Sequence, residues 1–175
     1  MKTTAFSISI YKYKVENWNI KKEKLLDLFN NFQHKTVANV ITSPIDIRTN
    51  ILLEEIKKFE QEIKINFNLL NFWFQKYENG MDHAPHNHGQ IGFSSVCFVE
   101  YNKNFHKPTT FIFPFINCFN GDVERYEPDV NEGDIIFFPS NLLHYAPINT
   151  SDKERIISSF NLKPNLNDKI QLTYK

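Results

Sequence analysis

Three of the six histidines of this chain lie within seven residues, in the stretch HAPHNHG at positions 83–89. His86 and His88 are two positions apart, so on an extended segment both imidazoles point to the same side and can reach one metal ion. His83 lies at an odd offset, with Pro85 in between, and is expected to point elsewhere. Because imidazole is the commonest metal-binding side chain in proteins, the pair predicts two ligands of a metal site.

A third ligand is expected from His144, which lies 56 positions after His88 and follows the apolar run DIIFFP. In a closed β-structure, strands far apart in the sequence become neighbours, so a later strand can bring His144 beside the earlier pair. Arg155 opens another apolar run, RIISSFNL, where its burial would be costly unless it met an anion. Taken alone, Arg155 is equally compatible with an exposed position at the start of a strand.

The hydrophobic pattern changes along the chain from helical to strand-like. Apolar residues recur at helical spacing in residues 20–33 and 51–65, and Thr49 or Asn50 is expected to cap the second helix. Short apolar or alternating runs, separated by turn residues, predict β-strands at residues 5–13, 69–77, 91–101, 109–115, 134–139 and 155–162, with 169–175 as a further edge strand. This pattern predicts a mainly β, α+β protein, a sandwich or barrel with its N-terminal helices packed on one sheet.

Length and charge narrow the functions that need to be considered. At 175 residues the chain is most simply one domain, residues 1–175, with helical support at about 20–66 and a metal-binding β core at about 68–162. Its 20 basic and 20 acidic residues cancel, so nothing indicates binding to nucleic acid or an anionic membrane. Cys97 and Cys118 lie among aromatic residues and are expected to be buried free thiols. Together with an N-terminus that lacks a signal-peptide pattern, they indicate a cytoplasmic protein.

The order of the motifs resembles that of the Fe(II)- and 2-oxoglutarate-dependent dioxygenases, in particular a small branch of that family common in phages and bacteria. The stretches that carry the resemblance, over about residues 50–162, are NFWFQKYENGMDHAPHNHG, GFSSVCFVEY, GDIIFFPSNLLHYAP and RIISSFNL. The resemblance implies a double-stranded β-helix (jelly roll) with iron at one open end, held by His86, His88 and His144. It also implies Arg155 as the partner of the distal carboxylate of 2-oxoglutarate, and Ser159, which shares strand parity with Arg155, is a second candidate donor.

The same resemblance implies Fe(II), 2-oxoglutarate and O2 as cofactor and cosubstrates, and hydroxylation of a substrate with release of succinate and CO2. One departure concerns the ligands, because His88 stands where the family usually has a carboxylate. Two histidines and one carboxylate form the usual facial triad of non-haem iron oxygenases, so Asp82 and Glu100 stay open as alternative ligands. A second departure is Ile157, where many relatives carry Ser.

Other classes of protein share parts of this pattern. Gly80-x5-His86-x-His88 and Gly133-x5-Pro139 followed by His144 also resemble a cupin signature, although the Glu expected soon after the first histidines is absent. A binding module without metal and a zinc hydrolase are further alternatives. The substrate, a small molecule or a macromolecule, stays open, and so does a homodimer. The loops at 102–108 and 116–131 are expected to border the entrance, and the aromatic residues expected near the pocket are Trp73, Phe93, Phe98 and Phe138.

Overall fold

The computed structural model describes residues 7–32 and 45–165 of the chain. It contains two helices, α1 (Trp18–Phe32) and α2 (Ile45–Ile63). The strands are β1 (Tyr11–Lys14), β2 (Phe67–Tyr77), β3 (His83–His86), β4 (Phe93–Glu100), β5 (Thr110–Ile116), β6 (Val123–Tyr126), β7 (Asp134–Pro139), β8 (His144–Ala146) and β9 (Arg155–Pro164).

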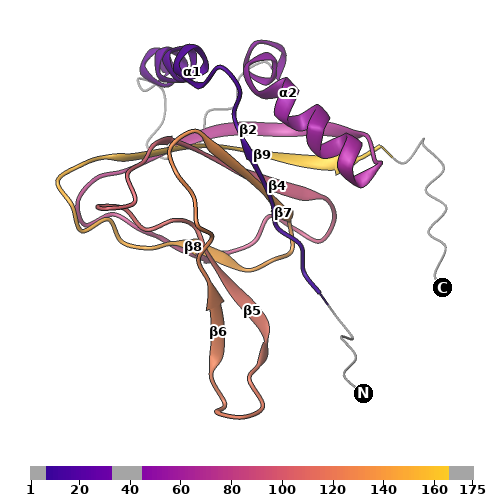
Figure 1. The fold of residues 1–175 in the computed structure, drawn as a ribbon, viewed down its shortest axis with the longest axis vertical. Helices are drawn as coiled ribbons and strands as arrows, with labels where there is room; N and C mark the ends of the chain where they lie inside the picture. Colours follow the sequence, from indigo (N-terminus) through magenta and orange to yellow (C-terminus); the bar gives the residue numbers. More distant parts are fainter. Residues whose placement is uncertain (1–6, 33–44, 166–175) are drawn as a thin grey trace.

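The strands form two antiparallel sheets. Sheet A has the order β1-β7-β4-β9-β2, and sheet B has the order β3-β8-β5-β6. From β3 onward the chain passes repeatedly from one sheet to the other, so each sheet contains strands that are distant in the sequence. This alternation builds the double-stranded β-helix, or jelly roll, that the motifs imply. The outer part of the β5–β6 hairpin projects away from the rest of the molecule (Figure 1).

Three strands of sheet A, β4, β7 and β9, are buried on both faces, which explains the continuous apolar run of β7. In β7, Ile135 and Phe137 point to one side of the sheet, while Ile136 and Phe138 point to the other. The same alternation divides the side chains of β4 and β9. The first side packs against the helices and forms a helix-side core, and the second faces sheet B and forms an inter-sheet core.

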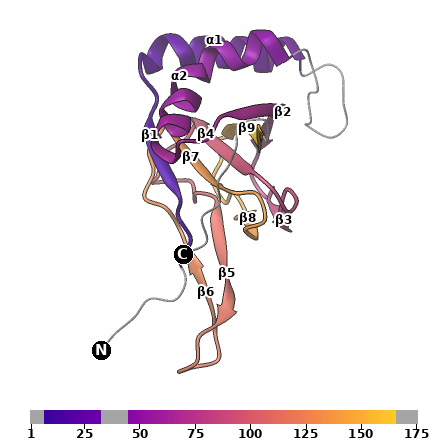
Figure 2. The ribbon, with the colours of Figure 1, turned by 90° about the vertical axis from the view of Figure 1, so that its right-hand side faces the viewer.

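Both helices cover the outer face of sheet A, as the apolar stripes of the sequence predict (Figures 1 and 2). Phe59 of α2 is fully buried and stacks on Phe137 of β7, with ring centroids 4.5 Å apart. The expected cap of the second helix is wrong, because α2 already begins at Ile45 and contains both Thr49 and Asn50. A kink at Leu52, where φ is −110° and ψ is 16°, interrupts the helix two residues after Asn50. No helix of the described residues is long and apolar enough to cross a membrane.

The strands predicted from longer apolar runs agree with β2, β4, β5, β7 and β9 to within a few residues. The N-terminal strand is shorter than predicted, because residues 7–10 are not in a strand and β1 covers only Tyr11–Lys14. Three strands of three or four residues, β3, β6 and β8, were not predicted. The predicted strand 169–175 lies outside the described residues.

Both cysteines are free thiols, but only Cys97 is buried. Cys118 is exposed in the turn of the β5–β6 hairpin, so its predicted burial is wrong.

Gly92 precedes β4 and approaches another strand so closely that no side chain fits there. Its φ is +106°, and a Cβ atom would lie 2.1 Å from the carbonyl oxygen of Leu162. Gly89, three residues earlier in the same loop, also has a φ of +106°, but a Cβ atom would meet nothing within 4 Å. At Gly89 only the backbone conformation requires glycine, whereas at Gly92 the backbone conformation and the lack of space both require it.

We predict that Gly89→Ala lowers the free energy of unfolding by about 1–2 kcal/mol, the cost of a left-handed backbone for alanine. Gly92→Ala is expected to lower it by at least about 3 kcal/mol, because β4 must also move away from β9. Urea denaturation followed by circular dichroism measures both values. Equal losses in the two variants would contradict the close approach of Gly92 to β9.

Candidate metal centre

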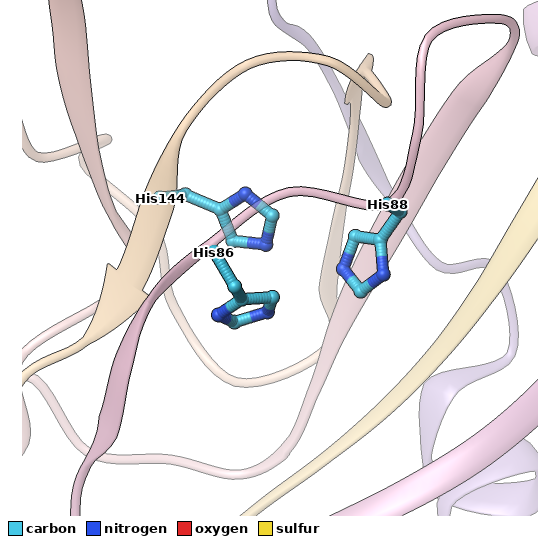
Figure 3. A group of neighbouring side chains, drawn as sticks. All are labelled: His86, His88 and His144. Atoms are coloured by element: carbon cyan, nitrogen blue, oxygen red, sulfur yellow. The ribbon is translucent and has the colours of Figure 1, made fainter.

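The three histidines selected from the sequence converge on one point (Figure 3). His86, His88 and His144 can each offer a ring nitrogen, and these nitrogens lie within 4.8 Å of one another. The ring of His144 lies 4.4 Å from that of His86 and 5.1 Å from that of His88, centroid to centroid. Nitrogens bound to one ion at about 2.1 Å are some 3–4 Å apart, so small side-chain rotations would close this group on a metal.

Pairing between two short strands of sheet B places the first two rings. His86 in β3 and His144 in β8 are directly opposite one another in the antiparallel register. His88 lies beyond the end of β3, in a loop that two backbone hydrogen bonds attach to the end of β7. The N–H of His88 donates to the carbonyl of Ser140 (2.8 Å), and the N–H of Ser140 donates to the carbonyl of Gly92 (3.0 Å).

Backbone carbonyls fix which nitrogen of each paired ring is free. His86 Nδ1 lies 2.7 Å from the carbonyl oxygen of Ala84, and His144 Nδ1 lies 2.9 Å from that of Leu142. Because a carbonyl only accepts, each Nδ1 carries the proton and donates, which leaves the Nε2 lone pair available. A ring held in this way by its second nitrogen is the usual arrangement of a metal-binding histidine.

Burial keeps two of the rings in the form that binds metal. Burial, with a smaller contribution from neighbouring His86, lowers the pKa of His144 to about 3 and that of His88 to about 4. Both rings are therefore neutral at pH 7, and a neutral imidazole is the form that binds a metal ion.

The carboxylates considered as alternative ligands lie elsewhere. Glu100 forms an ion pair with Lys22 of α1 (3.0 Å), and Asp82 is exposed to solvent. Among the residues that the structure describes, no other group of three or more His, Cys, Asp or Glu side chains is close enough to hold a metal. His83 is not part of this group, but its ring stacks on His86 at 4.0 Å, so the expectation that it points away is wrong. Its Nδ1 lies 3.2 Å from Gln75 Oε1.

A cavity of about 30 Å³ adjoins the three rings. This volume holds about two water molecules and is smaller than 2-oxoglutarate. Ser159 lines it, as its strand parity predicts, together with Trp73. Four other polar side chains of the cavity wall were not predicted, although the alternation in NFWFQKY indicates the first two: Gln75, Tyr77, Thr109 and Tyr145.

Arg155 is buried, with 2% of its surface exposed, which excludes the exposed alternative. Its Nη1 donates to the carbonyl of Lys107 and its Nη2 to that of Pro147, while its buried Nε has no partner. Within the described residues no carboxylate forms an ion pair with it, and burial lowers the pKa of the guanidinium from its ordinary value. The ring of Tyr77 lies 4.2 Å from the guanidinium carbon and also lines the cavity. Tyr77 therefore contacts both the guanidinium of Arg155 and the cavity beside the three histidines.

The aromatic residues expected near the pocket have different surroundings. Trp73 packs against His88 with ring centroids 5.3 Å apart, and Phe138 packs against His144 at 4.8 Å. Phe98 belongs to the inter-sheet core. Phe93 faces the helices instead and contacts Phe59 at 4.9 Å, so its predicted place near the pocket is wrong.

Comparison with known proteins shows the family to which the chain belongs. A family model described as "Putative 2OG-Fe(II) oxygenase" matches residues 71–161, which include the three histidines, Arg155 and Ser159. This match covers more than half of the chain, and the protein belongs to this family of 2-oxoglutarate- and Fe(II)-dependent oxygenases. It is therefore an oxidoreductase that uses Fe(II), 2-oxoglutarate and O2.

Solved structures with the same fold share little sequence with the chain. The viral collagen prolyl hydroxylase of Paramecium bursaria Chlorella virus-1 has a TM-score of 0.63 and 13% identity, over 93% of this chain and 97% of that one. A Pseudomonas putida prolyl-4-hydroxylase has a TM-score of 0.61 and 12% identity, over 90% and 93%. The alpha-ketoglutarate-dependent epimerase SnoN of nogalamycin biosynthesis has a TM-score of 0.66 and 12% identity, over 89% and 78%. No curated protein matches the sequence.

We predict that His144→Gln weakens Fe(II) binding by at least about 100-fold, more than the 10–100-fold typical when a residue that only supports a ligand is lost. His83→Gln is the matched control, since His83 stacks on His86 but lies outside the converging group. It is expected to weaken binding by less than about 10-fold. Anaerobic equilibrium dialysis with Fe(II) measures both, and a larger loss in the control would show that the ligands are assigned wrongly.

Proposed function

We propose that His86, His88 and His144 bind the Fe(II) of this oxygenase, and that Arg155 and Ser159 bind the distal carboxylate of 2-oxoglutarate. The observation that carries the proposal is the convergence of three imidazoles from β3, β8 and the loop that follows β3. Imidazole nitrogens suit iron, so the donor set fits the metal that the family uses. When bound, the iron supplies the redox chemistry that couples conversion of O2 and 2-oxoglutarate to succinate and CO2 with hydroxylation of a C–H bond.

The role proposed for Arg155 rests on the burial of its positive charge without an anionic partner among the described residues. A guanidinium withdrawn from water is costly unless an anion or a full set of acceptors replaces the solvent. The backbone carbonyls of Lys107 and Pro147 use two of its donors, and the buried Nε remains unpartnered. A carboxylate fits the remaining donors, because the planar fork of arginine matches its two oxygens. We propose that Tyr77 turns aside for that contact, because its ring packs on the guanidinium and also lines the cavity.

Three neutral ligands give this centre a different charge from the usual triad. With no protein carboxylate among the ligands, the two positive charges of the ion are left for the bound cosubstrate to balance. Around the site, Trp73 packs against half-buried His88, and Phe138 packs against buried His144. Exclusion of water strengthens each electrostatic contact in the pocket.

The substrate is unidentified, and the loops that border the site are proposed to select it. Cys97 and Cys118 are free thiols, which supports a reducing compartment, and we propose the cytoplasm as the place where the protein acts.

Anaerobic titration of the Fe(II)-loaded protein with 2-oxoglutarate tests the proposed function. A keto acid that chelates Fe(II) gives a visible charge-transfer band, and we expect this band to appear and saturate. In the His144→Gln variant the band should be absent at the same concentrations of iron and cosubstrate. Firm metal binding without a band in the unaltered protein would contradict an oxygenase that uses 2-oxoglutarate.

Arg155→Leu is expected to raise the Kd for 2-oxoglutarate in the same titration by about 100-fold, the usual scale for truncating one partner of a buried charge pair. Arg155→Lys should restore only part of the affinity, because lysine lacks the planar fork. Iron binding and the circular dichroism spectrum show that each variant is folded. Lys153→Leu, which removes an exposed cation two residues away, is the control, and equal effects at both positions would remove the proposed anchor.

A further inference from the structure

A buried histidine outside the metal centre lies next to a carbonyl that holds Arg155. His106 belongs to the loop between β4 and β5 and is 5% exposed. The next residue, Lys107, accepts the hydrogen bond from Nη1 of Arg155 through its carbonyl oxygen. Because Pro108 follows, the backbone of Lys107 is restricted to extended conformations. The direction of this carbonyl therefore depends on how the loop is held at His106.

The two nitrogens of the His106 ring join distant parts of the chain. Nδ1 accepts a hydrogen bond from the backbone N–H of Asn102 (3.1 Å), and Nε2 donates to the carbonyl of Lys153 (3.0 Å). The hydroxyl of Tyr101 also donates to the carbonyl of His106 (3.2 Å). Because a backbone N–H only donates and a carbonyl only accepts, the ring is neutral and carries its proton on Nε2.

The surroundings of the ring favour this neutral form. Burial lowers the pKa of His106, and the positive charge of Arg155 acts in the same direction. The hydrogen bond to the Lys153 carbonyl and the charge of Glu100 act against this change. Only the neutral ring can accept from Asn102 and donate to Lys153 at the same time. The form present at pH 7 is therefore the one that closes the loop.

The carbonyl of Lys153 connects the histidine to the other groups around the guanidinium. Besides the bond from His106, it accepts one from Nδ2 of Asn149 (2.7 Å), which also donates to the carbonyl of Tyr77 (2.9 Å). The ring of Tyr77 packs on the guanidinium of Arg155 at 4.2 Å. One network of hydrogen bonds therefore joins the β4–β5 loop to the strand whose aromatic ring contacts Arg155.

We propose that His106 is a positioning residue for Arg155. The ring fixes the β4–β5 loop on the connection between β8 and β9, and the loop in turn holds the Lys107 carbonyl against Nη1. With Nη1 and Nη2 both bonded to carbonyls, the guanidinium keeps one orientation before a ligand arrives. A group that is ordered in advance loses less conformational freedom on binding, which raises the affinity for 2-oxoglutarate. This role rests on the binding of 2-oxoglutarate that is proposed for Arg155.

The Nη signals of Arg155 in nuclear magnetic resonance spectra test this role without 2-oxoglutarate. The full-length, isotope-labelled protein carries Zn(II), a diamagnetic substitute for Fe(II), and the signals lost in Arg155→Lys assign those of Arg155. We expect separate Nη signals, because bonds to fixed carbonyls hinder rotation of the guanidinium. His106→Leu removes both hydrogen bonds of the ring and should merge the signals. His106→Gln can still donate to the Lys153 carbonyl and should keep them separate.

Anaerobic titration of the Fe(II)-loaded protein with 2-oxoglutarate measures the effect on binding. His106→Leu should raise the Kd about 10-fold, the scale of one or two neutral hydrogen bonds, with unchanged affinity for Fe(II). His106→Gln should recover part of the lost affinity. Lys107→Ala is the matched control, because it removes a side chain that is 66% exposed but keeps the carbonyl that Arg155 uses. Its Kd should equal that of the unaltered protein.

Separate Nη signals in His106→Leu, or an unchanged Kd in that variant, would overturn the role of His106. The role would also be overturned by an equal loss of affinity in His106→Gln, which would assign the effect to packing of the ring. An equal loss in Lys107→Ala would do the same, because it would assign the effect to the loop as a whole. If the unaltered protein gives no charge-transfer band, the proposed function fails, while the Nη signals still decide whether His106 positions Arg155.

Discussion

The candidate site depends on one cross-strand pair, in which His86 of β3 faces His144 of β8. These strands have only four and three residues, so little main-chain pairing holds them in register. Their position comes from larger neighbours: β8 also pairs with β5, and sheet B is held against sheet A by the inter-sheet core. The positions of the two ligand side chains therefore depend on packing that extends well beyond β3 and β8.

Sheet A contributes through the separation of its two faces. Its central strands present one row of side chains to the helices and the other to sheet B, so the same strands that close the helix-side core also supply Arg155, Ser159 and the floor of the site. The helices pack on the outer face of sheet A, whereas His86 and His144 belong to sheet B. The helices cover apolar surface that would otherwise be exposed on sheet A, which lets the inner face carry polar and charged groups.

The sequence predicted much of this architecture, in some places for the wrong reason. Long runs such as DIIFFP identify strands because burial on both faces requires continuous apolar residues, whereas β3, β6 and β8 are too short to show a period. Strand alternation was used to bring His86 and His88 together, but His88 lies in a loop, and hydrogen bonds around Ser140 place it. The alternation of side chains along a strand also predicts the wrong direction for His83, because the β3–β8 pairing is irregular between His83 and His86. The cover of Tyr77 over Arg155 depends on three-dimensional packing that no local pattern encodes.

The small cavity beside the histidines has a kinetic consequence. If 2-oxoglutarate reaches Arg155 only when Tyr77 has turned away, the protein must first visit a rare open conformation. An open state populated at about 1% would weaken the apparent affinity about 100-fold relative to the open form alone. The observed association rate would then level off at high ligand concentration, at the rate at which the aromatic ring moves. The speed of a single side chain, more than diffusion, would set how fast this protein takes up its cosubstrate.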